Sequence, residues 1–249
     1  MGNGVRRLIA LVSMLAGAVA AFAASGDEIL ARVERTLTGP RDYEGTATMV
    51  LSRADGTRRE ERTLRMWMAG TDKSVIKFLS PAGIEGISLL TLSGDEMYLY
   101  LPAQNKIRRI ESGGKNEDFQ GTDFSYSEMG SYDYQEDYLA EIRSEDSSSW
   151  TLALKRKPGA DRPYDRISMV VDKSTSVPRA IELYQGDKLK KVLAILEVKK
   201  SGSYTVPSRI RMENVEKKHV TEMTIGELKF DQGLEAQDVF SKRFMKKKG

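Results

Sequence analysis

The chain contains one histidine, His219, and no cysteine, so the side chains that most often carry nucleophilic and metal chemistry are nearly absent. Zinc, copper and haem sites depend on histidine and cysteine ligands, and this composition excludes most of them. Serine hydrolases need a base beside the nucleophile, and the chain has no G-x-S-x-G elbow. Because His219 follows Lys217 and Lys218 at a predicted hairpin turn, we interpret it as a surface histidine. We therefore predict a protein that is not an enzyme and holds no cofactor or metal.

Paired carboxylates are the remaining route to catalysis. Asp133 and Glu136 lie in an acidic segment and would serve as acid and base on a glycosidic bond if the fold placed them on either side of it. The same segment lacks the spacing of an EF-hand calcium loop. The stretch Gly113-Gly114-Lys115 lacks the Ser or Thr and the strand–helix context of a phosphate loop. A sugar- or lipid-modifying enzyme therefore stays as the third alternative, after two non-enzymatic functions.

Most of the chain has a hydrophobic period of two, which predicts β-strands. The strands are joined by tight turns such as Asp55-Gly56, and no helical crossover separates them, so we predict a mainly β fold with an antiparallel meander. We expect one domain over residues 24–249. The predicted strands are Tyr43–Leu51, Arg58–Met68, Lys73–Leu79, Ile87–Leu92, Met97–Leu101, Lys106–Ile110, Ala140–Ser144, Trp150–Lys157, Ile167–Asp172, Arg179–Tyr184, Lys190–Val198, Ser208–Val215 and Thr221–Phe230.

Two helices flank the predicted strands. Ser25 and Glu28 form a capping box, an apolar stripe follows, and Gly39-Pro40 ends the helix. A second, short helix is expected at Glu235–Arg243. A helix with one apolar face needs a sheet to cover it, and large antiparallel sheets covered in this way form curved or closed barrels.

One face of the predicted barrel is apolar and rich in methionine, a side chain that adapts to ligands of varied shape. A hydrocarbon chain bound there would gain about 0.8 kcal/mol for each buried CH₂ group. Ordinary core packing explains the same pattern, so an open cavity and a packed core both remain possible. The residues predicted to line the cavity are Met49, Leu51, Leu64, Met66, Met68, Ile76, Phe78, Met97, Leu99 and Leu101.

The first 23 residues have the features of a secretory signal peptide. Arg6 and Arg7 precede an apolar stretch over residues 8–22, and Ala21-Phe22-Ala23 is a cleavage signal. The stretch is too short for a transmembrane anchor, and no cysteine is available for lipid attachment, so we expect an exported and soluble mature chain. The net charge of +3 is too small to indicate a nucleic-acid-binding surface. The basic tail Lys242–Lys248 is expected to be solvated, with a weak contact to anionic lipid headgroups as the alternative.

The segment Asp118–Met129, DFQGTDFSYSEM, resembles a signature of the LolA-like outer-membrane lipoprotein-sorting proteins of bacteria, in particular an uncharacterised periplasmic branch. Other motifs agree in order, namely Pro81–Ile87, Met97–Pro102, Lys106–Ile110 and Val206–Ile210. The resemblance covers nearly all of the chain after the signal peptide. It implies an incomplete, half-open antiparallel β-barrel with helices as a plug in its mouth.

The resemblance also implies a function. It predicts a monomeric periplasmic carrier that binds acyl chains of lipoproteins or lipids in a hydrophobic cavity and passes them toward the outer membrane. An inner-membrane transporter and an outer-membrane acceptor would be its partners, and nucleic acid would not. Because the uncharacterised branch is often associated with large inner-membrane exporters, the second alternative is an accessory protein that docks on an exporter without carrying lipid.

The segment Glu111–Tyr138 is long, acidic and aromatic, and it has no strand pattern. A loop of this length is usually functional or disordered, and its six aromatic residues argue against disorder. We expect one helical turn at Ser125–Met129, and Asp123 either capping that turn or pairing with Arg108 or Arg109. A purely structural loop is the alternative to a lid over the cavity. The predicted lid residues are Asp123, Phe124, Tyr126 and Met129.

Overall fold

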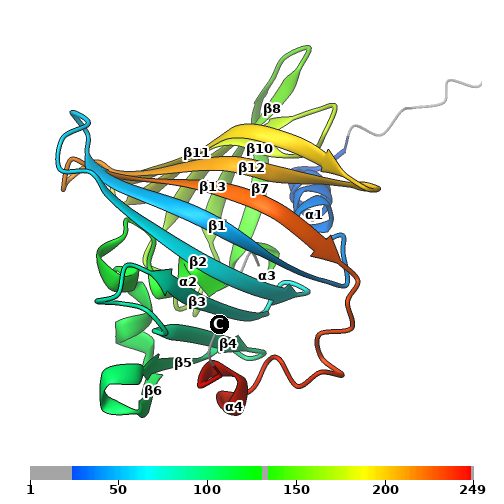
Figure 1. Cartoon of the computed structure of the whole chain (residues 1–249). Helices are drawn as coiled ribbons and strands as arrows, with labels where there is room; N and C mark the ends of the chain where they lie inside the picture. Colours follow the sequence, from blue (N-terminus) through cyan, green and yellow to red (C-terminus); the bar gives the residue numbers. More distant parts are fainter. Residues whose placement is uncertain (1–23, 131–133, 248–249) are drawn as a thin grey trace, which may run out of the picture.

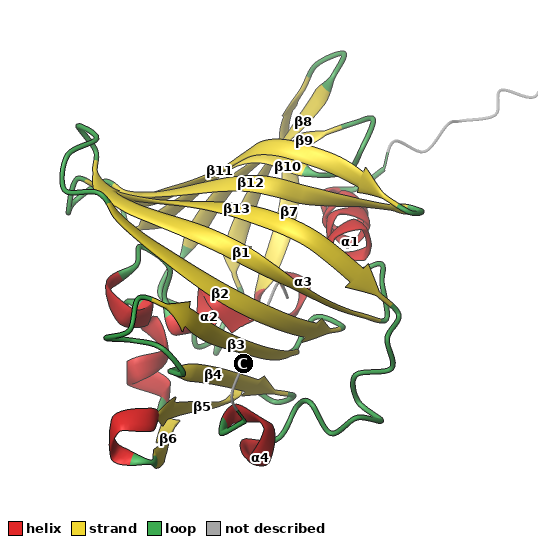
Figure 2. Cartoon of the chain, viewed as in Figure 1, coloured by secondary structure: helices red, strands yellow, loops and turns green. Residues whose placement is uncertain are grey.

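Thirteen strands form one antiparallel sheet in the computed structural model, which describes residues 24–130 and 134–247 (Figure 1). The strand order is β6-β5-β4-β3-β2-β1-β13-β12-β11-β10-β9-β8-β7. The sheet curves strongly, but β6 and β7 remain unpaired edges, so the barrel does not close (Figure 2). The prediction of a mainly β, half-open antiparallel barrel with a few helices is confirmed. The predicted signal peptide and Asp133 lie outside the described residues.

The strands agree closely with the predicted ones. They are β1 (Asp42–Arg53), β2 (Glu60–Ala69), β3 (Lys73–Ser80), β4 (Ser88–Leu92), β5 (Glu96–Leu101), β6 (Lys106–Ile110), β7 (Tyr138–Glu145), β8 (Ser149–Arg156), β9 (Arg166–Asp172), β10 (Pro178–Gln185), β11 (Lys188–Ser201), β12 (Tyr204–Asn214) and β13 (His219–Phe230).

Local chemistry explains the β1–β2 hairpin. The Asp55 carboxylate accepts hydrogen bonds from the backbone N–H of Thr57 at 2.9 Å and from its hydroxyl at 2.7 Å. Gly56 has a φ of 81°, which a glycine adopts without strain. The turn holds β1 and β2 in register, from Leu51 opposite Glu60 to Asp42 opposite Ala69.

Strand β12 begins four residues earlier than predicted, because Pro207 lies inside it rather than before it. The register between β11 and β12 shifts on either side of Glu197, and Val198 then faces Pro207. An irregular ladder accommodates a residue that has no N–H to donate, since proline within a sheet is confined to edges and bulges.

Helix α1 (Gly26–Leu37) lies against β7 and protects that edge of the sheet. Its capping box is present, with the Ser25 hydroxyl bound to the Glu28 N–H and the Glu28 carboxylate bound to the Ser25 N–H. Asp27 accepts the backbone N–H of Ala140 at 2.8 Å, which satisfies one donor of the edge strand. The approach is close, because a Cβ on Gly26 would lie 2.3 Å from the Ala140 oxygen.

The connection between β6 and β7 runs from one edge of the sheet to the other. It contains the 3-10 helices η2 (Ser112–Asn116) and η3 (Phe119–Gly121) and the short helices α2 (Tyr126–Gly130) and α3 (Tyr134–Asp137). A further 3-10 helix, η1 (Pro102–Gln104), joins β5 to β6.

The C-terminal arm, residues 231–247, differs from its prediction. The expected helix at Glu235–Arg243 is wrong, because the only helix in the arm is α4 (Lys242–Met245). The Asp42 carboxylate binds the N–H groups of residues 232, 233 and 234 at 2.6 to 3.0 Å and keeps this stretch from coiling. Three widely spaced apolar side chains of the arm, Leu234, Val239 and Met245, then pack on the outer face of the sheet.

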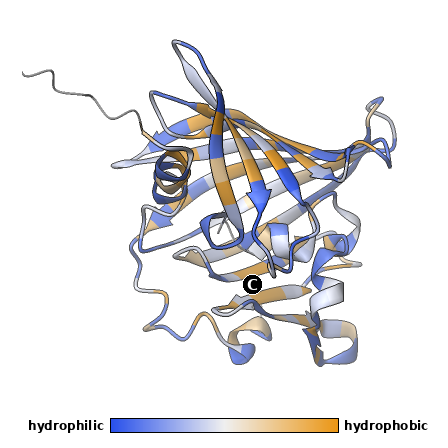
Figure 3. Cartoon of the chain, turned by 180° about the vertical axis from the view of Figure 1, so that it is seen from behind, coloured by the Kyte–Doolittle hydropathy of each residue, from blue (hydrophilic) through white to orange (hydrophobic). Residues whose placement is uncertain are grey.

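The sheet therefore has apolar cores on both faces. The larger core lies on the concave face, and a smaller one lies between β2–β5 and the C-terminal arm. Figure 3 shows the underlying alternation of apolar and polar residues along the strands. Within the described ranges, no helix combines the length and the apolar character needed to cross a bilayer.

Candidate ligand cavity and its plug

A cavity of about 150 Å³ lies on the concave face of the sheet. Its walls come mainly from β9 to β13, with a smaller part from β2 and β3, and they are overwhelmingly apolar. The lining side chains on these strands are Met66, Met68, Ile76, Ile167, Pro178, Ile181, Leu183, Leu193, Ile195, Val206, Pro207, Ile210, Met212, Met223, Ile225 and Leu228.

The volume limits what the cavity holds in this conformation. An engineered apolar cavity of about 150 Å³ stays dry and binds benzene. The cavity is therefore large enough for one ring or a few CH₂ groups. A long hydrocarbon chain requires additional space. The segment that covers the cavity forms part of the wall outside the sheet, as do Leu37 of α1 and Pro163 between β8 and β9.

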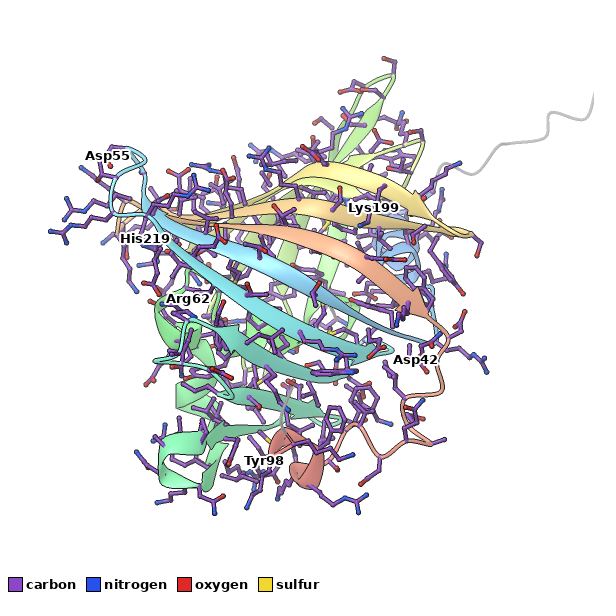
Figure 4. All side chains as sticks on the ribbon, viewed as in Figure 1. Asp42, Asp55, Arg62, Tyr98, Lys199 and His219 are labelled. Atoms are coloured by element: carbon purple, nitrogen blue, oxygen red, sulfur yellow. The ribbon has the colours of Figure 1, made fainter. Side chains whose placement is uncertain are left out.

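Residues 117–130, which we call the plug, cover the concave face between the two halves of the sheet. The Phe119 ring stacks on Phe78 of β3 with 5.2 Å between ring centroids, and Tyr126 packs edge-on against Phe119. Arg62 of β2 donates to the backbone oxygen of Gln120 at 2.6 Å (Figure 4). This end of the concave face is consequently filled by the plug.

A buried carboxylate fastens the plug to β13. Asp123 is 1% exposed, and its carboxylate accepts the Thr221 hydroxyl at 2.7 Å and lies 2.7 Å from the His219 Nδ1. The Asp123 N–H also donates to the Thr221 hydroxyl. We call this set the Asp123 latch.

The Asp123 latch corrects two expectations. Asp123 neither caps α2 nor pairs with Arg108 or Arg109, which are exposed on the edge strand β6. The cap of α2 is Ser125, whose hydroxyl binds the Glu128 N–H. His219 follows the turn as predicted and its side chain is 28% exposed, but its ring also contacts Asp123 of the plug.

A second polar contact fastens the plug further along the same half of the sheet, at β11 and at Tyr164 just before β9. The Glu128 carboxylate accepts the Lys191 ammonium at 2.8 Å and the Tyr164 hydroxyl at 2.9 Å. Tyr138 donates to the backbone oxygen of Tyr164 at 2.9 Å and extends the network. Burial, together with the negative charge of Glu128, holds the pKa of Tyr164 far above its usual value of 10.0. Burial likewise raises the pKa of Tyr138.

Solved structures resemble this fold along almost its whole length. A DUF1329 family protein from Desulfovibrio piger is 24% identical, with a TM-score of 0.81, and the match covers 88% of this chain and 97% of that one. A putative outer membrane lipoprotein-sorting protein domain from Vibrio parahaemolyticus is also 24% identical, with a TM-score of 0.80 and coverage of 89% and 98%. The LolA superfamily protein NE2245 from Nitrosomonas europaea is 16% identical, with a TM-score of 0.75 and coverage of 89% and 100%.

The sequence itself matches a family model described as "Uncharacterized protein" over residues 70–247. The chain belongs to the family that this model describes. Its fold is similar to that of the LolA superfamily protein. No functionally curated protein matches it. The predicted resemblance is thus confirmed, and the LolA-like fold of the chain is the half-open sheet described above.

The LolA-like protein brings only part of the predicted lining to the cavity. Met66, Met68 and Ile76 line it, as do Phe124 and Met129 of the predicted lid. Six other predicted residues are buried in the packed core beneath the plug, and Leu101 lies partly buried at its margin. Those six are Met49, Leu51, Leu64, Phe78, Met97 and Leu99. Tyr126 packs on Phe119 and Asp123 on β13, both outside the lining.

The prediction from sequence missed the larger wall of the cavity. Ile181 and Leu183 of β10, and Ile210 and Met212 of β12, line it and have the same period-two pattern as the residues that were chosen. The pattern marked both halves of the sheet, and nothing in it showed which half the plug would fill. Within the ranges that the structure describes, no three metal-ligating side chains form a group.

Proposed function

We propose that this LolA-like protein is a carrier that holds the acyl chain of a lipid or lipid-modified protein in its cavity. The observation that carries the proposal is the apolar cavity covered by a plug, which is fastened through polar contacts to β2 on one half of the sheet and to β13 and β11 on the other. Apolar walls supply affinity without specific contacts, at about 0.8 kcal/mol per buried CH₂. Polar fastenings are exchangeable, because water can replace each partner when the plug moves.

We further propose the setting in which the carrier works. The first 23 residues act as a signal peptide that directs the chain to the periplasm, and residues 24–249 form one domain. The carrier is monomeric and non-enzymatic, receives cargo from an inner-membrane transporter and delivers it to an outer-membrane acceptor. The printed description of the Vibrio parahaemolyticus structure, a putative outer membrane lipoprotein-sorting domain, supports this direction of transport.

Strand β11 provides a matched pair of variants for the test. Leu193 lines the cavity, whereas Leu196 on the same strand is 44% exposed. Leu193→Trp fills space inside the cavity, and Leu196→Trp adds the same side chain outside. A fluorescent fatty-acyl probe should bind the wild type and Leu196→Trp equally and should bind Leu193→Trp at least tenfold more weakly.

The experiment also separates the carrier from its alternative. Mass spectrometry of lipid extracted from protein purified without detergent should find acyl species near one per molecule. A wild-type protein that is empty and takes up no probe would reject the carrier and favour an accessory that docks on an exporter without lipid. Equal probe binding by both tryptophan variants would place the ligand outside this cavity.

A further inference from the structure

The C-terminal arm presents a group of cations on the outside of the sheet, away from the cavity. Lys242, Lys246 and Lys247 are exposed, and no carboxylate of the described residues forms an ion pair with any of them. Arg243 beside them pairs with Asp238 at 2.8 Å. Exposed lysines that lack acidic partners keep their full charge available to an external anion.

Aromatic rings lie directly beneath these cations. The Lys242 Nζ is 3.8 Å from the centroid of the Tyr98 ring, and the Lys246 Nζ is 6.0 Å from that of Tyr100. Both tyrosines lie on the outer face of β5, and the exposed Arg109 of β6 is opposite Tyr98. Figure 4 shows Tyr98 beside α4, far from the hairpin labelled at Asp55. We call the group formed by Tyr98, Tyr100, Arg109, Lys242, Lys246 and Lys247 the basic–aromatic patch.

The charge of the patch is clearly positive. Among the described residues, the carboxylates that form a hydrogen bond or an ion pair with the patch or with Arg243 beside it are Glu96, which accepts the Tyr98 hydroxyl and lies 3.8 Å from Arg109, and Asp238, which pairs with Arg243. The cations outnumber these two carboxylates, and Lys248 continues the basic run in the sequence.

A buried lysine fixes the backbone that carries the patch. Lys77 is 1% exposed, and its ammonium donates to the backbone oxygens of Lys247 at 2.6 Å and Phe244 at 3.4 Å. Ser88 donates to the Met245 oxygen at 3.0 Å, and the Met245 side chain is fully buried. The backbone is therefore held on the sheet while the cationic side chains extend outward on flexible stems.

We infer that the basic–aromatic patch docks the protein on the surface of a bilayer that contains anionic phospholipid. Clusters of lysine and arginine are attracted to anionic leaflets, and tyrosine rings suit the level of the lipid headgroups. Flexible lysines on a fixed backbone fit a fluid anionic surface, which presents no fixed positions for its charges. Docking uses the outer face of the sheet and leaves the cavity on the inner face free, so it does not depend on cargo.

Vesicle co-sedimentation of the mature chain tests this inference. Vesicles of phosphatidylcholine alone are compared with vesicles that also contain phosphatidylglycerol, at low and high salt. The test variant is K242Q/K246Q/K247Q. The matched control is R53Q/R58Q/R59Q, which removes the same charge from the exposed β1–β2 hairpin at the other end of the molecule.

The wild type should bind only the anionic vesicles, and added salt should weaken the binding. The test variant should bind roughly 100-fold more weakly, at about fivefold for each lysine removed, whereas the control should stay within about threefold of the wild type. Equal losses in both variants, unchanged binding in the test variant, or equal binding to neutral vesicles would each overturn the inference.

The acyl probe keeps this result separate from the proposed function. The test variant should take up the fluorescent fatty-acyl probe as the wild type does, because the patch does not line the cavity. Vesicle binding without probe uptake would reject the carrier and retain the docking surface. Probe uptake without vesicle binding would retain the carrier and reject the docking surface.

Discussion

The two ends of the concave face have similar strands but different interiors. At the β2–β5 end, Phe119 of the plug stacks on Phe78, and the space is filled. At the β9–β13 end, side chains of the same type, such as Leu183 and Ile210, line an open cavity. The comparison shows that the alternation of a strand creates an apolar wall, whereas the covering segment decides whether that wall becomes core or cavity.

Shortening a buried side chain at the filled end should cause the largest loss of stability. Phe119→Ala removes a fully buried ring and leaves a cavity between Phe78 and Tyr126, so the free energy of unfolding should fall by about 3–5 kcal/mol. Chemical denaturation measures the change. A loss below about 1 kcal/mol would show that the plug does not contribute to the core, and the contrast between the two ends would fail.

The Asp123 latch should have the next largest effect. Asp123→Ala leaves the buried Thr221 hydroxyl and the His219 Nδ1 without their carboxylate partner, and the free energy of unfolding should fall by about 1–3 kcal/mol. Amide hydrogen exchange should accelerate more in the plug than in β9–β13. Equal acceleration throughout the sheet would show that the latch acts on global stability rather than on the plug.

A matched pair of leucines compares the ends directly. Leu99 is 1% exposed in the filled end, and Leu183 is 4% exposed but faces the cavity. Leu99→Ala should lower the free energy of unfolding by about 2–5 kcal/mol. Leu183→Ala should lower it by at least about 1 kcal/mol less, because part of the space around Leu183 is already empty. Equal losses on denaturation would indicate that both ends are packed alike.

The smallest effect is expected from alkaline pH. Since the pKa of Tyr164 is raised in the folded protein, the native state retains a proton that the unfolded state loses above pH 10. The stability is therefore full below pH 10 and declines as the pH rises, by about 0.4 kcal/mol at pH 10 for this one tyrosine. Tyr164→Phe should flatten the decline. An unchanged slope in denaturation curves measured from pH 9 to 11 would contradict the role of burial at this site.

Much of the architecture could be predicted from local signals. The capping box at Ser25 and Glu28, the Asp55-Gly56 turn and the period-two strands depend on neighbours within a few residues, and all are present. The conformation of the C-terminal arm could not be predicted from local signals, because Asp42, nearly 200 residues earlier, binds the backbone of residues 232–234.

The candidate site was less accessible to prediction for the same reason. Met66 and Met68 lie beside the space that the structure leaves open, whereas Met49 and Met97 lie in the packed core, although their patterns are alike. The partner of Asp123 was missed because His219 and Thr221 are 96 and 98 residues away in the sequence. Only the folded sheet shows which strand lies under which part of the plug.

The pairing of β1 with β13 has a consequence for the order of events during folding. Thr48 faces Thr224 in the ladder that joins the two halves of the sheet, so this contact spans most of the chain. Contacts between residues so distant in sequence form slowly, because a large loop must close first. Until β13 is available, any sheet formed by β1 to β6 has an inner edge, on β1, without its neighbour. An unpaired edge of this kind invites pairing with other chains. The pairing of β13 with β1 therefore covers an edge that is otherwise a template for other chains.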